Sequence, residues 1–187
     1  MMSRLKILKD KTFPEYIFSY KFDSILVFDL SLIMNPNLCF FEYLNDFLIK
    51  TNESYLYIDN VLPFSYISST PLSNEKIYVE KFSYKYVIKG RVNGNEIRKD
   101  LQLPDGAGYF SVVSQCLISG NSSKWGVYYS VDTDLILIGL SKEIKIIFEN
   151  TCMNKDVFKD YHIKKELFDQ FISDPEILRI FKQNYSK

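Results

Sequence analysis

Alanine, histidine and tryptophan are almost absent from this sequence, with one residue of each among 187. With so little alanine, the core must be filled by branched and aromatic side chains, and the chain has 14 tyrosines and 15 phenylalanines. An excess of charge of either sign is also missing, because 23 basic side chains balance 23 acidic ones. A neutral protein has no overall field that would steer nucleic acid or an anionic membrane towards it.

Cysteines and long apolar runs are few as well. The three cysteines, Cys39, Cys116 and Cys152, are an odd number at wide spacing, which matches neither a disulfide framework nor a zinc site. The most apolar run, 25–34, contains Asp29 and is too short to span a bilayer. The first residues lack the apolar stretch of a secretory signal. We therefore expect a reduced, cytoplasmic protein without a membrane partner.

The stretch 124–148 is the part of the chain around which we expect the fold to be built. Two β-rich runs flank Asp132-Thr133-Asp134, which predicts a hairpin with a polar turn. The second run, 135–140, is apolar on both faces and should be covered on both sides, as a central strand is. Ser141 then stands where it can cap a helix over 142–149.

The first half of the chain alternates strand and helix signals. Apolar patterns predict strands over 16–20, 24–33 and 55–58. Asn35-Pro36 is a typical helix start, and the apolar side chains that follow share one helical face. The stretch 63–74 is polar and rich in turn residues, which predicts a loop.

A second hairpin is predicted over 76–103, because Asn93-Gly94 is a strong signal for a two-residue turn. Alternation around that turn places aromatic and aliphatic side chains on one face. The other face is basic and carries Lys81, Lys85, Lys89, Arg91 and Arg98.

The remaining segments favour helices. Apolar stripes predict one helix over 109–117, with Cys116 and Leu117 in the stripe, and another over 155–172. Ser173-Asp174-Pro175 ends that helix and begins the next. The whole pattern predicts an α+β fold, a mainly antiparallel sheet with helices packed against it, in a single domain over 1–187.

Candidate catalytic and metal-binding residues are sparse. Asp132 and Asp134 could share a hard cation with a phosphate, as in a metal-dependent enzyme. Aspartate also stabilises turns by bonding to nearby backbone, and we favour this interpretation. His162 is the sole histidine that a Ser–His or Cys–His pair could use, but its predicted helix is polar there. We predict no catalytic residue, metal or cofactor, and we do not expect an enzyme.

The basic face and the aromatic side chains each have two interpretations. Lysines on a strand face can bind phosphates, and they can also prevent unwanted edge pairing, which we favour here. Trp125, Tyr128 and Tyr129 have the composition of an interface anchor, but alternation separates Tyr128 from the other two. We expect Trp125 to be in the core.

One pattern resembles bacterial immunity-type proteins. It consists of Trp-Gly-x-Tyr at 125–128, the polar turn and Leu-Ile-Leu-Ile-Gly-Leu at 135–140, with a predicted helix on either side. These proteins belong to contact-dependent and polymorphic toxin systems, and the resemblance covers about residues 105–150. It implies a cytosolic protein that binds a cognate toxin and performs no chemistry. Such families have no shared set of functional residues.

The leading hypothesis is therefore an immunity or inhibitor protein that neutralises a toxin by covering its active site. Tyr128, Asp132 and Asp134 are the candidate contacts with that partner. The alternative is an anion- or nucleic-acid-binding module that uses the basic hairpin face 81–98.

Overall fold

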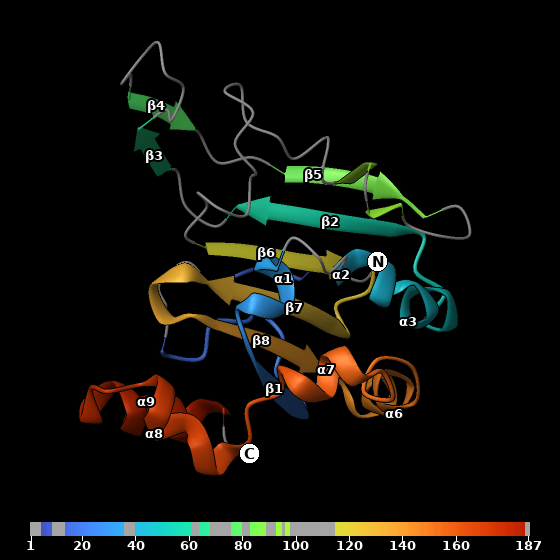
Figure 1. The fold of residues 1–187 in the computed structure, drawn as a ribbon. Helices are drawn as coiled ribbons and strands as arrows, with labels where there is room; N and C mark the ends of the chain where they lie inside the picture. The colour runs from blue at the N-terminus through green and yellow to red at the C-terminus, as the bar shows by residue number, and fades with distance from the viewer. Residues whose placement is uncertain are drawn as a thin grey trace.

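The centre of the fold is a six-stranded antiparallel sheet with the strand order β1-β8-β7-β6-β2-β5, seen from bottom to top in Figure 1. The computed structural model describes residues 5–8, 14–35, 40–60, 64–67, 76–79, 83–88, 93–94, 96–97 and 115–185. The sheet strands are β1 (Ser24–Asp29), β2 (Tyr55–Asn60), β5 (Ser83–Val87), β6 (Gln115–Gly120), β7 (Trp125–Ser130) and β8 (Leu135–Leu140). A separate pair consists of β3 (Phe64–Ile67) and β4 (Lys76–Val79).

Helical segments cover both faces of the sheet. They are α1 (Ser31–Met34), α2 (Phe40–Tyr43), α3 (Asn45–Lys50), η1 (Val131–Thr133), α6 (Lys142–Thr151), α7 (Asp156–Asp160), η2 (Lys165–Leu167), α8 (Phe168–Phe171) and α9 (Pro175–Tyr185). The first core forms between one sheet face and α1–α3, α6 and α7, and the second between the other face, the N-terminal segment and α8–α9. The predicted α+β class with a mainly antiparallel sheet is confirmed.

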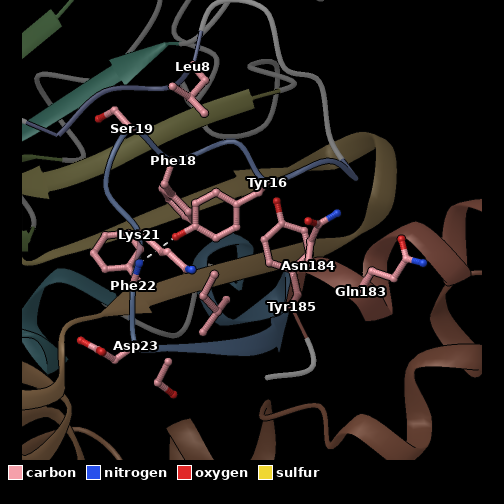
Figure 2. A pocket seen from close by; sticks show the side chains of 12 residues that line it. Leu8, Tyr16, Phe18, Ser19, Lys21, Phe22, Asp23, Gln183, Asn184 and Tyr185 are labelled. Carbon is pink, nitrogen blue, oxygen red and sulfur yellow. Dashed lines mark hydrogen bonds between the residues drawn. The ribbon is translucent and has the colours of Figure 1, made fainter.

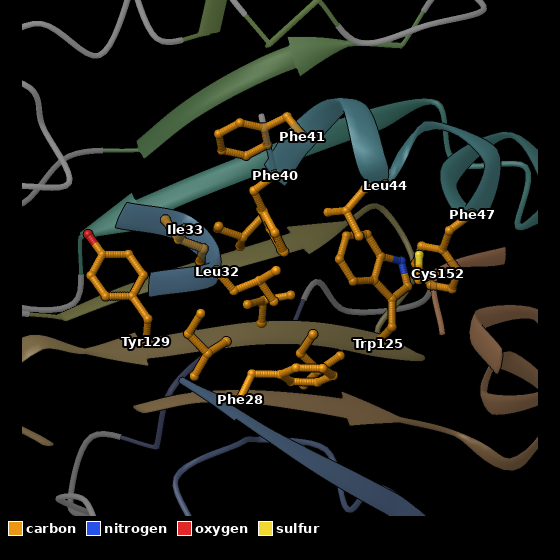
Figure 3. Close-up of a cluster of buried hydrophobic side chains, with 14 of the residues drawn as sticks. Phe28, Leu32, Ile33, Phe40, Phe41, Leu44, Phe47, Trp125, Tyr129 and Cys152 are labelled. Carbon is orange, nitrogen blue, oxygen red and sulfur yellow. The ribbon is translucent and has the colours of Figure 1, made fainter. Parts of the chain in front are cut away.

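The first core contains eight buried aromatic residues among its aliphatic ones (Figure 3). Phe47 of α3 meets Trp125 of β7 edge to face, with ring centroids 5.2 Å apart. Phe148 of α6 packs in the same way against Phe47 at 5.4 Å and against Phe158 of α7 at 5.5 Å. Edge-to-face pairs stabilise beyond the area that they bury, so these rings join three helices to the sheet.

The second core joins the two ends of the chain. Phe18 and Phe22 from the N-terminal segment pack on the same sheet face as Phe181 and Tyr185 of α9. Gly139 makes the close approach of Phe22 possible, because a Cβ there would lie 2.1 Å from the ring. The sheet therefore has one apolar layer on each side, as the two-faced apolar run 135–140 predicts.

Several local predictions are confirmed. β7, η1 and β8 form the expected hairpin, and β8 is an interior strand between β1 and β7. Asp134 ends η1 in the left-handed region with φ 53°, so the Asp-Thr-Asp stretch is the turn. Asp174 caps α9, because its Oδ1 accepts the N–H groups of Glu176 at 2.8 Å and Ile177 at 3.0 Å.

The predicted cap at Ser141 is wrong in its acceptor. The N–H of Lys142 donates to Oδ2 of Asp23 at 2.9 Å, and no cap bond comes from the Ser141 side chain. An exposed carboxylate from the N-terminal segment therefore takes the place of the adjacent hydroxyl at the start of α6.

The helix predicted over 109–117 is wrong at its end, because residues 115–117 begin β6, while 109–114 lie outside the described residues. Residues 16–20 form only one isolated bridge, from Phe18 to Ile7. The strand predicted over 24–33 stops at Asp29, whose Oδ1 accepts the N–H of Ser31 at 2.7 Å and starts a helical turn.

The hairpin predicted over 76–103 is also wrong at its turn. The N–H of Ile97 donates to the carbonyl of Asn93 at 3.1 Å, which is a helical bond, and β5 pairs with β2. β4 pairs with β3, which lies in the predicted loop 63–74. Residues 98–103 lie outside the described part of the chain. Distant strands supply these partners, and a local turn signal contains no information about them.

The helix predicted over 155–172 is interrupted after α7. The N–H of Asp29 donates to the carbonyl of Tyr161 at 2.9 Å, and the N–H of Ile163 donates to the carbonyl of Val27 at 2.9 Å. Pairing with the β1 edge therefore replaces helical bonds around His162. Within the described ranges, no helix is long and apolar enough to cross a membrane.

Candidate binding groove at the edge of the sheet

The structure removes one of the three predicted contact residues. Tyr128 is 1% exposed and belongs to the second core, so its prediction as a partner contact is wrong. It points into the apolar layer because its face of β7 is covered by the N-terminal segment and α9. Asp134 is exposed, and its carbonyl accepts the N–H of Leu30 at 2.9 Å. Asp132 lies in η1, and its side chain is not among those described.

The other sequence-predicted residues are distributed over the fold. Trp125 is 1% exposed, which confirms its place in the core. His162 is half-buried with its ring 5.2 Å from that of Phe28, and burial, with a contribution from Lys164, lowers its pKa. Among the described residues, no group of three or more His, Cys, Asp or Glu side chains could hold a metal ion.

Only Lys85 of the five predicted basic-face residues is described. Its Nζ lies 3.7 Å from the ring centroid of Tyr55 and 6.0 Å from that of Tyr57, on the neighbouring strand β2. The Lys85 ammonium group therefore makes a cation–π contact with a side chain of the same sheet. Lys81, Lys89, Arg91 and Arg98 lie outside the described residues or side chains.

A cavity of about 410 Å³ opens where the N-terminal segment meets the end of α9 (Figure 2). Most of its surface is apolar, and six aromatic or aliphatic residues and six polar ones line it: Leu8, Tyr16, Phe18, Ser19, Lys21, Phe22, Asp23, Ser24, Ile25, Gln183, Asn184 and Tyr185. An apolar pocket of this size with a few convergent polar groups has the character of a ligand site.

Two tyrosines hold the walls of this cavity in place. The Tyr16 hydroxyl donates to the carbonyl of Tyr20 and accepts the N–H of Phe22, both at 2.8 Å. The Tyr185 hydroxyl donates to the carbonyl of Glu15 at 2.5 Å, and the Tyr16 and Tyr185 rings stack with centroids 6.1 Å apart. Burial raises the pKa of both phenols, so both remain protonated donors at neutral pH.

A second cavity of about 200 Å³ adjoins the first along β1. The two share Ser24, Ile25 and Tyr185. The lining of the second is Ser24, Ile25, Leu26, Val27, Lys145, His162, Ile163, Lys164, Lys165, Phe168 and Tyr185. It contains three lysines and no acidic side chain, so its electrostatic character is positive. We call the two cavities together the β1 groove.

Glu53 is the centre of a buried polar cluster, which the sequence analysis did not predict. The side chain is 5% exposed, and its Oε1 accepts Trp125 Nε1 at 2.7 Å and Ser122 Oγ at 2.5 Å. Its Oε2 accepts the N–H groups of Asn121 at 2.8 Å and Ser122 at 3.3 Å. Gly120 leaves room for the carboxylate, since a Cβ there would lie 2.3 Å from Cδ of Glu53.

The Glu53 cluster is a structural clamp. Asn121 Oδ1 in turn accepts the N–H groups of Ser54 at 2.7 Å and Tyr55 at 3.3 Å, so the α3–β2 turn and the β6–β7 turn bind each other. Four donors surround the one carboxylate, which satisfies a buried charge and leaves little capacity for chemistry.

The two described cysteines, Cys116 and Cys152, are buried and are not in a disulfide. Burial raises the pKa of the Cys152 thiol to about 12. At pH 8 the thiolate fraction should then be about a thousandfold smaller than in the unfolded chain, where the pKa is about 8.5. We expect iodoacetamide to modify Cys152 at least about a hundredfold faster in concentrated urea than in buffer, measured by mass spectrometry of its peptide. Equal rates would contradict the burial of this thiol.

The structure is that of an α+β protein with a six-stranded antiparallel sheet, covered on both faces, and a groove at one edge. Comparison with protein-family models, with curated proteins and with solved structures finds no match for this chain.

Proposed function

We propose that this protein binds another polypeptide through the β1 groove. The observation that carries the proposal is the side-by-side placement of an aromatic cavity and a lysine-lined cavity along one strand edge. A groove that follows the edge of a strand suits an extended chain. The partly exposed ring of Tyr16 offers a contact to an apolar anchor of the partner.

The resemblance over residues 105–150 suggests which partner this is. We infer a stoichiometric inhibitor of the immunity type, which neutralises a cognate toxin by covering its active site. The exposed turn residue Asp134 precedes Leu135, which pairs with Asp29 at the end of β1 opposite to Ser24. Asp134 and Asp132 stay candidate contacts, at a position separate from the point where the two cavities meet.

Blocking the aromatic cavity should abolish partner binding. Lys21 is exposed and lines this cavity, so Lys21→Trp should fill it and reduce the amount of captured partner by at least about tenfold. Lys182→Trp is the matched control, since Lys182 is exposed on α9 and does not line the cavity. The measurement is capture from native cytosol with each tagged protein, followed by quantitative mass spectrometry.

The proposal predicts proteins that the wild type and Lys182→Trp retain and Lys21→Trp loses. It fails if nothing is retained by the wild type, or if all three proteins retain the same set in equal amounts.

A variant with lysine at positions 132 and 134 tests the turn in the same assay. Unchanged retention would remove Asp132 and Asp134 from the interface.

A further inference from the structure

We propose that the partner contributes an extended, acidic segment, which pairs with the N-terminal half of β1, around Ile25, as an additional strand. This inference rests on the proposed function and specifies how the β1 groove binds. Three features of the described residues carry it: the direction of the β1 backbone groups, the short segment that already covers half of this edge, and the charge of the groove.

The backbone direction follows from the hydrogen bonds at the other half of the strand. Asp29 donates its N–H to Tyr161, and Val27 accepts the N–H of Ile163, both on the side away from β8. Backbone groups alternate along a strand, so every second residue of β1 points to the same side. The N–H and C=O of Ile25 and the N–H of Val27 therefore also point away from β8. No described residue forms a bond with any of these three groups.

The edge is covered only in part. Residues 161–163 form one antiparallel bridge with β1, at Phe28 and His162, and the chain then turns into η2. The stretch Ser24–Val27 is left as the floor of the lysine-lined cavity. An edge with unpaired N–H and C=O groups is a template for strand addition, and grooves beside it accept alternate side chains. The bridge at His162 thus marks the end from which a partner strand continues the ladder.

The charge of the groove selects the segment. Lys145 of α6 stands on one side of the edge, and Lys164 and Lys165 follow the bridging segment. Lys145 has a loose ion pair with Glu149 at 3.8 Å, in which both side chains are about half exposed, so its charge is only weakly compensated. An added strand with glutamate or aspartate at alternate positions would pair with Lys145 and Lys164. A bulky apolar side chain in the same strand would enter the aromatic cavity.

The direct test uses a defined probe, a fluorescein-labelled hexapeptide of sequence Glu-Val-Glu-Phe-Glu-Val, with a matched peptide in which lysine replaces glutamate. Amide hydrogen exchange is followed residue by residue by NMR. Saturation with the acidic probe should slow exchange at Ile25 by at least about tenfold. Exchange at Leu26, whose N–H points towards β8, should not change. The lysine peptide should bind at least about tenfold more weakly.

The inference is overturned if the acidic probe does not bind at about 1 mM, if both peptides bind equally, or if the Ile25 amide is unaffected at saturation. A second arm uses the captured partner with Lys145→Glu/Lys164→Glu, and Lys159→Glu as a control, since Lys159 is exposed on α7 outside the groove. We expect about tenfold loss in the double variant only. If Lys21→Trp abolishes capture while this double variant retains it, the groove binds the partner without an acidic added strand. If neither change affects capture, the proposed function fails too.

Discussion

Replacing Glu53 with alanine is expected to lower the free energy of unfolding by about 3 kcal/mol. The change removes the acceptor for Trp125 Nε1–H and for the N–H groups of Asn121 and Ser122. The Trp125 side chain is 1% exposed, so its donor cannot turn to solvent. A buried donor that loses its partner costs about 1–3 kcal/mol, and bonds to a charged acceptor are at the upper end.

Urea denaturation followed by the fluorescence of Trp125, the sole tryptophan, measures this effect. Glu143→Ala is the matched control, because Glu143 pairs with Lys124 at 2.8 Å but its side chain is 76% exposed. An exposed pair of this kind contributes at most about 1 kcal/mol. Glu53→Gln should fall between alanine and wild type, since the amide keeps one oxygen acceptor. A Glu53→Ala protein as stable as the control would show that the clamp does not stabilise the fold.

Phe148→Ala is expected to cost about 4 kcal/mol, the largest effect of any single change considered. The ring is 1% exposed and contacts Phe47 and Phe158 edge to face, at the point where α3, α6 and α7 meet. Removing it leaves a cavity that these two rings can fill only by leaving their positions against Trp125 and Phe28. The cost therefore includes both the lost burial and the cavity.

Ile146→Ala on the same helix is the control for Phe148→Ala. Ile146 is 57% exposed, so its truncation should change the free energy of unfolding by less than about 0.5 kcal/mol. Alanine favours the helix more than either original residue does, so this effect has the same sign in both variants. The difference between their free energies of unfolding therefore reports the burial of Phe148. A difference below about 1 kcal/mol would contradict the three-helix aromatic contact.

Elements whose signals are local could be predicted from the sequence. The hairpin over 125–140 has its turn residues between two apolar runs, and both the turn and the strands are confirmed. Asp174 and Pro175 similarly mark the start of α9 within a few residues. The burial of Trp125 follows from the same reasoning, because its face of the strand is apolar throughout. In each case the physical cause lies in neighbouring residues.

Elements that depend on distant partners could not be predicted in this way. β5 pairs with β2 and not with the residues after Asn93, and residues 161–163 leave the helix to pair with β1. The apolar pattern that predicts a helix over 109–117 includes residues 115–117. These residues are in a strand because β6 pairs with β2 on one side and with β7 on the other. The stability of a strand depends on its cross-strand neighbours, and a periodic pattern does not predict which strands pair.

The candidate site shows the same division. The sequence by itself determined an aromatic-rich α+β protein with a central hairpin, a polar turn at Asp132–Asp134 and a buried Trp125. Tertiary structure alone decided that Tyr128 is buried, that Glu53 clamps two turns, and that Tyr16, Ile25 and Tyr185 line one groove. The reason is that apolar periodicity records how each segment buries its own face, whereas a groove forms where segments from the two ends of the chain leave an edge strand uncovered.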